Sequence, residues 1–167
     1  MPREPETPLA RARAVALRFL AARARTEAQV RARLEKADLA GVADETVAWL
    51  VGLGYLDDAA YARARARALL APGRLGPRLA ERRLAAAGVP AARAREAVAE
   101  VLAEAGGEGA GPGEVALCRA LATRRAHGAD PAGLEEDARR RIARFLLGRG
   151  FSPSVVARVL GVWADSD

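Results

Sequence analysis

The sequence predicts an all-α protein made of three tandem three-helix repeats in an elongated array. The main observation is an apolar pattern that occurs three times, in which a leucine is followed five residues later by another large apolar residue. The three pairs are Leu34 with Leu39, Leu84 with Val89, and Leu146 with Phe151. Four residues before these leucines stand Val30, Ala80 and Ile142. Each copy therefore combines one helical apolar face with an apolar residue just beyond the helix end.

A second observation concerns the ends of these helices. Gly88 and Gly150 precede the second apolar residue in two of the copies, and Asp38 has that place in the first copy. A residue in the left-handed conformation ends many helices at this position, and glycine adopts it most easily. The copies lie too far apart for a coiled coil, and helical units of this size usually stack into binding surfaces.

The first repeat is expected over residues 9–56, after a disordered tail over residues 1–8. Thr26 and Gln29 have the spacing of a capping box, so we expect them to open the second helix. Asp44 is expected to cap the third helix through its carboxylate.

Residues 54–58 are expected to form the junction between the first two repeats. Gly54 should end the third helix, and Tyr55 and Leu56 should fold back over that end. The Tyr55 ring is expected to pack between the two repeats. Asp57 or Asp58 should cap the next helix.

The second repeat is expected over residues 57–104. Residues 61–68 alternate between alanine and a larger residue, and this period by itself favours a strand. Alanine and arginine are among the best helix formers, however, so we predict a helix. Gly76 and Pro77 should open the second helix of this repeat, and Pro90 should open the third.

The third repeat is expected over residues 114–164, after a glycine-rich linker over residues 105–113. Helices are predicted near 114–127 and 134–149, and a last helix should open at Pro153. The apolar face of this last helix is predicted to contain Val156, Val159, Leu160 and Trp163.

The positive charge of the chain is concentrated in the second repeat. The net charge is +6, yet the segments on either side are nearly neutral. If the first two helices of the repeat pack as a hairpin, six arginines can form one patch for carboxylates or phosphates. They are Arg63, Arg67, Arg74, Arg78, Arg82 and Arg83. The alternative is a solvated face produced by biased coding, because 26 of the 27 basic residues are arginine.

A second basic cluster lies in the third repeat, where nearby carboxylates partly balance it. The arginines are Arg139, Arg140, Arg141 and Arg144, and the carboxylates are Glu135, Glu136 and Asp137. We expect these carboxylates to complement the dipole at a helix start.

The sequence predicts no enzyme, no metal and no cofactor. His127 is the only histidine, and its place near Gly128 is typical of a cation at a helix C-terminus. Cys118 is the only cysteine and shares a helical apolar face, which is typical of a packed core thiol. The glycine-rich segment lacks the lysine and the preceding strand of a P-loop.

We expect a soluble cytoplasmic protein and a monomer. A single cysteine cannot form an internal disulfide, which points to a reducing compartment. The N-terminus has no signal-peptide pattern, and no apolar run approaches the roughly 20 residues of a membrane span. Three units can also bury each other's apolar faces without a partner copy.

Several segments together resemble the RecX family of recombinase regulators, from about Ala10 to Trp163. The segment Gly54-Tyr55-Leu56-Asp57-Asp58 followed by Tyr61-Ala62-Arg63 is similar to the signature that joins the family's first two repeats. Gly76-Pro77-Arg78 and the run from Arg144 to Phe151 resemble segments of its second and third repeats. The glycine-rich linker departs from the family's usual compact junction.

The resemblance implies a helical, non-enzymatic modulator that binds the RecA recombinase filament and reduces its ATPase, strand-exchange and co-protease activities. The six arginines of the second repeat would then contact the filament. Single- or double-stranded DNA is a further candidate partner. Two alternatives stay open: a helical protein that binds DNA or RNA without a recombinase, and a helical adaptor whose charge is incidental.

Overall fold

The computed structural model describes residues 7–71, 74–105 and 113–162, and these residues form nine α-helices, two short 3-10 helices and no strand. The all-α prediction is confirmed. The α-helices are α1 (Pro8–Ala21), α2 (Glu27–Glu35), α3 (Ala43–Gly52), α4 (Asp58–Leu70), α5 (Pro77–Ala86), α6 (Ala91–Ala105), α7 (Gly113–Arg125), α8 (Glu136–Gly148) and α9 (Pro153–Val159). The 3-10 helices are η1 (Ala40–Val42) and η2 (Pro131–Gly133).

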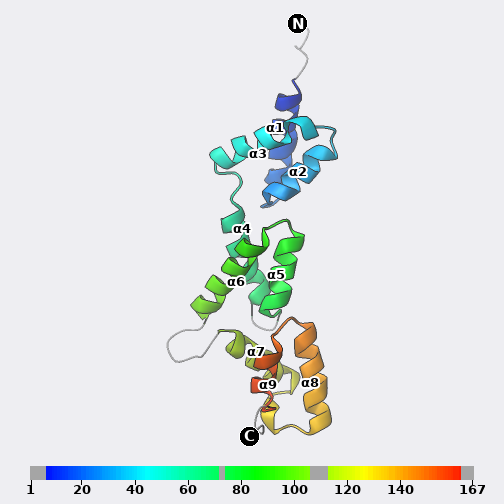
Figure 1. Cartoon of the computed structure of the whole chain (residues 1–167), viewed down its shortest axis with the longest axis vertical. Helices are drawn as coiled ribbons and strands as arrows, with labels where there is room; N and C mark the ends of the chain where they lie inside the picture. The colour runs from blue at the N-terminus through cyan, green and yellow to red at the C-terminus, as the bar shows by residue number, and fades with distance from the viewer. Residues whose placement is uncertain (1–6, 72–73, 106–112, 163–167) are drawn as a thin grey trace.

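The helices group in threes along one long axis, so the molecule is an elongated array (Figure 1). Each group surrounds a separate cluster of buried apolar side chains. The first unit, α1 to α3, is built around Leu34 and Leu50, and the second, α4 to α6, around Leu84 and Val98. The third unit, α7 to α9, is built around Leu146 and Phe151.

The repeated pattern found in the sequence defines the same structure in all three units. The three leucines and the apolar residue five positions after each of them are buried. The backbone N–H of the second residue donates to the carbonyl of the leucine, at 3.0 Å for Leu39, 3.1 Å for Val89 and 3.2 Å for Phe151. This six-to-one hydrogen bond is the signature of a Schellman helix end.

The residue before each second apolar position has the predicted left-handed backbone. Its φ is 57° at Asp38, 89° at Gly88 and 91° at Gly150. Glycine tolerates this conformation without cost, whereas aspartate is one of the few other residues that adopt it. The three copies therefore share one helix end, although only two of them carry glycine there.

The starts of several helices are also as predicted. Thr26 and Gln29 form the reciprocal capping box of α2, with the Thr26 hydroxyl accepting the Gln29 N–H. Pro77 is the first residue of α5 and Pro153 the first of α9. Proline fits this position because it has no N–H to leave unpaired.

The prediction for Asp44 was wrong. Helix α3 begins at Ala43, after η1, and its cap residue is Val42, which makes no side-chain capping bond. Asp44 lies in the first turn and accepts a hydrogen bond at 2.9 Å from Arg31 of α2. The 3-10 turn moved the helix start, so the Asp44 carboxylate joins two helices and caps neither of them.

The N-terminal helix begins one residue earlier than predicted, because Thr7 caps it. The Thr7 hydroxyl accepts the N–H of Ala10 at 3.2 Å, and Pro8 is the first helical residue. Trp163, predicted on the last helix, and residues 106–112 of the predicted linker lie outside the described residues.

Candidate interaction surface

The second unit divides the six predicted arginines between two places. Arg63 and Arg67 lie one turn apart on α4 and face α6. Arg63 is half-buried and lies in a shallow groove with Arg93, Glu96 and Glu100. This part of the predicted patch is therefore a mixed surface of both charges.

Arg67 is held by an acidic partner. Its guanidinium donates to both carboxylate oxygens of Glu104, with nitrogen–oxygen distances from 2.8 to 3.2 Å. These hydrogen bonds lower the pKa of the Glu104 carboxyl and raise the pKa of Arg67. A bidentate pair of this kind occupies the donors that a phosphate would need.

The other four arginines lie on α5 and in the turn before it. Arg78, Arg82 and Arg83 are exposed on α5, and Arg74 is exposed ahead of the helix. Among the described residues, none of the four has an acidic side chain within ion-pair distance. Arg78 and Arg82 are one helical turn apart, so they share a face of α5. Helix α5 therefore carries the open part of the predicted patch.

Helix α8 carries the second basic cluster. Arg141 and Arg144 are exposed and, with Arg140, line a shallow groove on this helix. Arg140 pairs with Glu136 one turn earlier, which partly balances the cluster as the sequence predicted. Arg139 is half-buried.

The junction at residues 54–58 holds the first two units together, but not through its tyrosine. Leu56 is buried, whereas the Tyr55 side chain is 59% exposed. The predicted packing of the Tyr55 ring between the units was wrong, because Gly54, with φ of 75°, ends the turn so that the following ring points outward. Leu56 packs into the core of the first unit instead.

The two aspartates of the junction have different partners. Asp57 caps α4 by accepting the N–H of Ala60 at 2.9 Å, and this hydrogen bond lowers the pKa of its carboxyl. Asp58 accepts the N–H of Glu27 from the first unit at 2.9 Å. Burial raises the pKa of the Asp58 carboxyl. The pair therefore caps one helix and connects two units.

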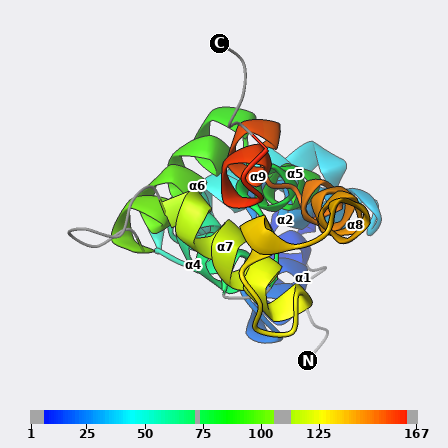
Figure 2. The same ribbon diagram turned by 90° about the horizontal axis from the view of Figure 1, so that it is seen from below.

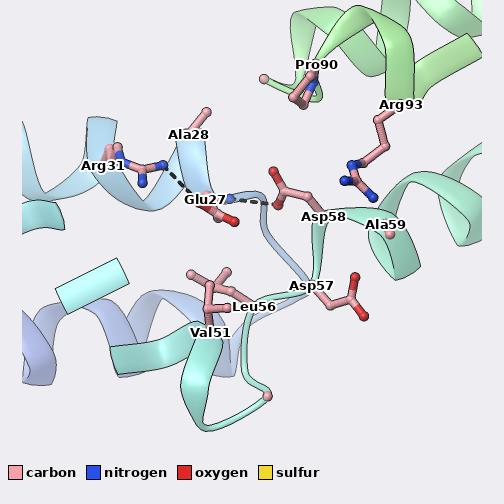
Figure 3. A pocket seen from close by; sticks show the side chains of 12 residues that line it. Glu27, Ala28, Arg31, Val51, Leu56, Asp57, Asp58, Ala59, Pro90 and Arg93 are labelled. Atoms are coloured by element: carbon pink, nitrogen blue, oxygen red, sulfur yellow. Dashed lines mark hydrogen bonds and ion pairs between the residues drawn. The ribbon is translucent and has the colours of Figure 1, made fainter. Parts of the chain in front are cut away.

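A groove of about 560 Å³ lies at this junction. Figure 3 shows Asp58 between Glu27 and Arg93, with Val51 and Leu56 on the opposite side. Its charged groups are mixed, and Arg31 is already bound to Glu27 and Asp44. The groove connects the units and has no concentrated charge of one sign.

The single cysteine and the single histidine lie in a core and at a helix end, respectively. Cys118 is buried in the third unit, and burial raises the pKa of its thiol to about 12, which suppresses the reactive thiolate. His127 is exposed just after α7, in the predicted place at a helix end. The described part of the chain contains no group of three residues arranged to hold a metal ion. None of its helices is long and apolar enough to cross a membrane.

Comparison with known proteins agrees with this architecture. Models of the first and third three-helix domains of RecX match residues 12–50 and 113–160. The curated "Regulatory protein RecX" from two strains of Thermus thermophilus is 39% identical over 142 residues, which cover 83% of this chain and 82% of the relative. The chain belongs to the RecX family.

Solved RecX structures have the same fold. A crystal structure of RecX from Lactobacillus salivarius superposes with a TM-score of 0.70 at 22% identity, over 93% of this chain and 96% of the other. A second crystal structure of regulatory protein RecX gives a TM-score of 0.72 at 22% identity, over 91% of this chain and 72% of the other. The helices of this RecX family member are thus arranged as in its relatives.

Two features of the RecX surface were missed in the sequence. Glu104 neutralises Arg67, and a signal for this was present, since both residues lie on helices predicted for the same unit. The second missed feature is a set of contacts between units, made by Thr26, Gly76 and Gly150. No signal for them was present in the sequence, because a capping residue or a helix-end glycine has the same local pattern whether or not another unit packs on it.

Proposed function

We propose that this protein binds the RecA recombinase filament and restrains its ATPase, strand-exchange and co-protease activities. Membership of a family of regulatory proteins supports a role exerted on another protein, and the resemblance of its repeats to recombinase regulators points to RecA. In this proposal the protein acts by binding, without catalysis or a cofactor. A filament of recombinase on DNA would place this activity in the cytoplasm.

The observation that carries the proposal is the exposed arginine face of α5. Arg78 and Arg82 are on α5, which belongs to the middle unit of an elongated array (Figure 1), and this unit holds the excess positive charge. An extended helical array can follow a polymer over several subunits, which a compact domain cannot do. The filament offers both acidic protein surface and DNA phosphates to these guanidiniums.

Charge reversal on α5 tests the proposal. Arg78→Glu with Arg82→Glu should leave folding intact, because both side chains are exposed and glutamate is a good helix former. The variant should need at least about tenfold more protein than wild type for equal suppression of RecA-driven ATP hydrolysis on single-stranded DNA, because attraction becomes repulsion. Wild-type inhibition should also weaken as salt rises.

Arg11→Glu with Arg18→Glu is the matched control, since both arginines are exposed on α1 of the nearly neutral first unit. It makes the same change in net charge and should retain inhibition. If the α5 variant inhibits as well as wild type, the α5 arginines form only a solvated face.

Direct binding to nucleic acid is the alternative, because exposed arginines also suit phosphates. It predicts binding to naked duplex DNA with a steep salt dependence. A plot of the logarithm of the binding constant against the logarithm of the salt concentration should have a slope of about −0.9 for each neutralised phosphate. Binding of equal strength with and without RecA would favour this alternative.

A further inference from the structure

The middle helices of the three units meet end to end. Helices α2, α5 and α8 descend along one side of the array (Figure 1), and the view along the axis shows them grouped on that side (Figure 2). The N-terminal end of α2 contacts the C-terminal end of α5. The N-terminal end of α5 in turn contacts the C-terminal end of α8. Each contact therefore gives a hydrogen-bond donor to a free carbonyl at a helix end, and in the second contact the donors are backbone N–H groups.

Both contacts use the same positions of the repeat. The carbonyl three residues after the leucine of the repeated pattern accepts a hydrogen bond from the cap residue of the preceding unit's middle helix. Ala87 O accepts from the Thr26 hydroxyl at 2.6 Å, and Arg149 O accepts from the Gly76 N–H at 2.8 Å. Thr26 and Gly76 are the N-cap residues of α2 and α5. The array thus repeats one joint between its units.

The joint between the second and third units contains two further hydrogen bonds. The N–H of Arg78, in the first turn of α5, donates to Gly150 O at 3.0 Å. The Arg149 guanidinium donates to Arg74 O at 3.3 Å, and it also packs over the Phe145 ring. An N–H in the first turn of a helix has no partner within its own helix, so the third unit supplies the missing acceptor.

The backbones approach so closely that a side chain would not fit. A Cβ atom on Gly76 would lie 2.5 Å from the Phe151 nitrogen, and one on Gly150 would lie 2.5 Å from the Leu79 nitrogen and Cβ. In the first joint, a Cβ on Gly88 would lie 2.4 Å from the Ala28 Cβ. Glycine is needed at all three positions for close approach, and at Gly88 and Gly150 also for the positive φ.

We propose that the Gly76–Gly150 joint fixes the orientation of the third unit, and that both glycines are positioning residues for partner binding. The second part of this inference rests on the proposed function. The first unit supports the interpretation, because Asp38 stands at the position of Gly88 and Gly150, and no described helix start packs against it. A residue with a Cβ atom, Asp38, therefore occupies this position in the unit where no neighbouring unit packs on it.

Amide hydrogen exchange of the full chain, resolved by NMR, tests the joint directly. In Gly150→Ala the protection of the Gly76 and Arg78 amides should fall by roughly tenfold or more, since their acceptors move away. The amides of Leu84 and Ile142 should stay protected, because the cores of both units remain folded. The control is Gly128→Ala. Gly128 has nearly the same φ as Gly150, 92° against 91°, so the backbone strain is matched, but the space around its Cβ position is open.

Gly76→Ala gives an independent test without backbone strain, because the φ of Gly76 is −86°. Its control is Gly148→Ala, close to the same joint but with nothing near its Cβ position. Gly76→Ala should expose the Arg78 amide, and Gly148→Ala should not. Unchanged protection at Arg78 in both joint variants would overturn the proposal. Loss of protection at Ile142 together with Arg78 would also overturn it, because the joint would then be part of one folding core.

Inhibition of RecA tests the positioning role separately. Gly150→Ala should need several-fold more protein than Gly128→Ala for equal suppression of ATP hydrolysis, because two misaligned units no longer bind the filament together. Equal inhibition despite an open joint would overturn the positioning role. If the wild type does not inhibit RecA, the proposed function fails, while the exchange experiment still decides the existence of the joint.

Discussion

At the scale of single residues, burial separates the leucines that hold the units from those that do not. Leu84 is fully buried in the second unit, whereas Leu53, beyond the end of α3, is 53% exposed. Removal of a buried leucine side chain loses its transfer free energy and leaves a cavity. The same truncation at an exposed position removes little.

Leu84→Ala should therefore lower the free energy of unfolding by about 2–5 kcal/mol. Leu53→Ala, the same chemical change, should stay within about 0.5 kcal/mol of wild type. Urea unfolding followed by circular dichroism measures both. Equal effects of the two variants would show that Leu84 is not the anchor of its unit.

Cys118 should make stability depend on pH in the alkaline range. Its pKa is raised to about 12 in the folded protein, so the unfolded chain loses this proton first as pH rises. Its contribution to stability is fully present below the ordinary thiol pKa of about 8.5. It is lost as pH rises from there toward 12, by up to about 1.4 kcal/mol per pH unit.

Urea unfolding of wild type and Cys118→Ala between about pH 7.5 and 10.5 measures this contribution. The stability of wild type should fall more steeply above about pH 9 than that of the variant, whatever packing the alanine loses. Parallel curves for the two proteins would contradict the buried, protonated thiol.

At the scale of helices, the caps bind neighbouring elements as well as their own helix. The Thr26 side chain is buried, accepts the Gln29 N–H at 3.2 Å and donates to Ala87 O at 2.6 Å. The same hydroxyl thus caps the N-terminus of α2 and hydrogen-bonds a carbonyl at the C-terminal end of α5. Loss of this hydroxyl leaves the Gln29 N–H and the Ala87 carbonyl, both partly buried, without this partner.

Thr26→Val keeps the shape of the side chain and removes its hydroxyl, so it should cost about 1–3 kcal/mol. Thr7→Val removes an exposed cap at α1 and should cost about 1 kcal/mol or less. Thermal unfolding compares the two variants. A smaller loss for Thr26→Val than for Thr7→Val would mean that the contact with α5 adds no stability.

The elements that sequence predicted well are those encoded locally. The Schellman ends at Gly88 and Gly150, the Thr26 cap and the proline starts of α5 and α9 depend on a few neighbouring residues, and these were confirmed. Pro90, predicted to open the third helix of the second repeat, lies just before α6, which begins at Ala91. Asp44 failed because a 3-10 turn, which left no clear pattern, moved the start of α3. The prediction for Tyr55 was wrong because a large ring was assumed to be buried, whereas its neighbour Leu56 is the residue that is buried, in the core of the first unit.

The surface was less predictable, since it depends on which side each helix presents. The hairpin of α4 and α5 was expected to join six arginines, but the α4 arginines face the acidic residues of α6. Helix periodicity places Arg63 and Arg67 together, but it does not select the neighbouring helix. The α5 arginines are exposed and close together, because helix periodicity alone places them on the outer side of one helix; their role in binding stays a prediction.

At the scale of the whole molecule, the three units form an extended array, in which each joint satisfies helix ends with the neighbouring unit's backbone or caps. The charge on α5 lies at its centre, with the cluster of α8 in the next unit (Figure 1). This arrangement suits a partner that is itself extended and negatively charged. In the proposed function, that partner is the RecA filament on DNA.

Co-sedimentation with preformed filaments distinguishes binding to the RecA filament from binding to DNA alone. The protein would be mixed at increasing salt with RecA filaments on single-stranded DNA, held by a slowly hydrolysed ATP analogue, or with the same DNA alone. We predict that it sediments with the filament at concentrations where it leaves naked DNA unbound, and that Arg78→Glu with Arg82→Glu abolishes this difference. Equal binding to naked DNA and filament, or no binding to the filament, would contradict the account.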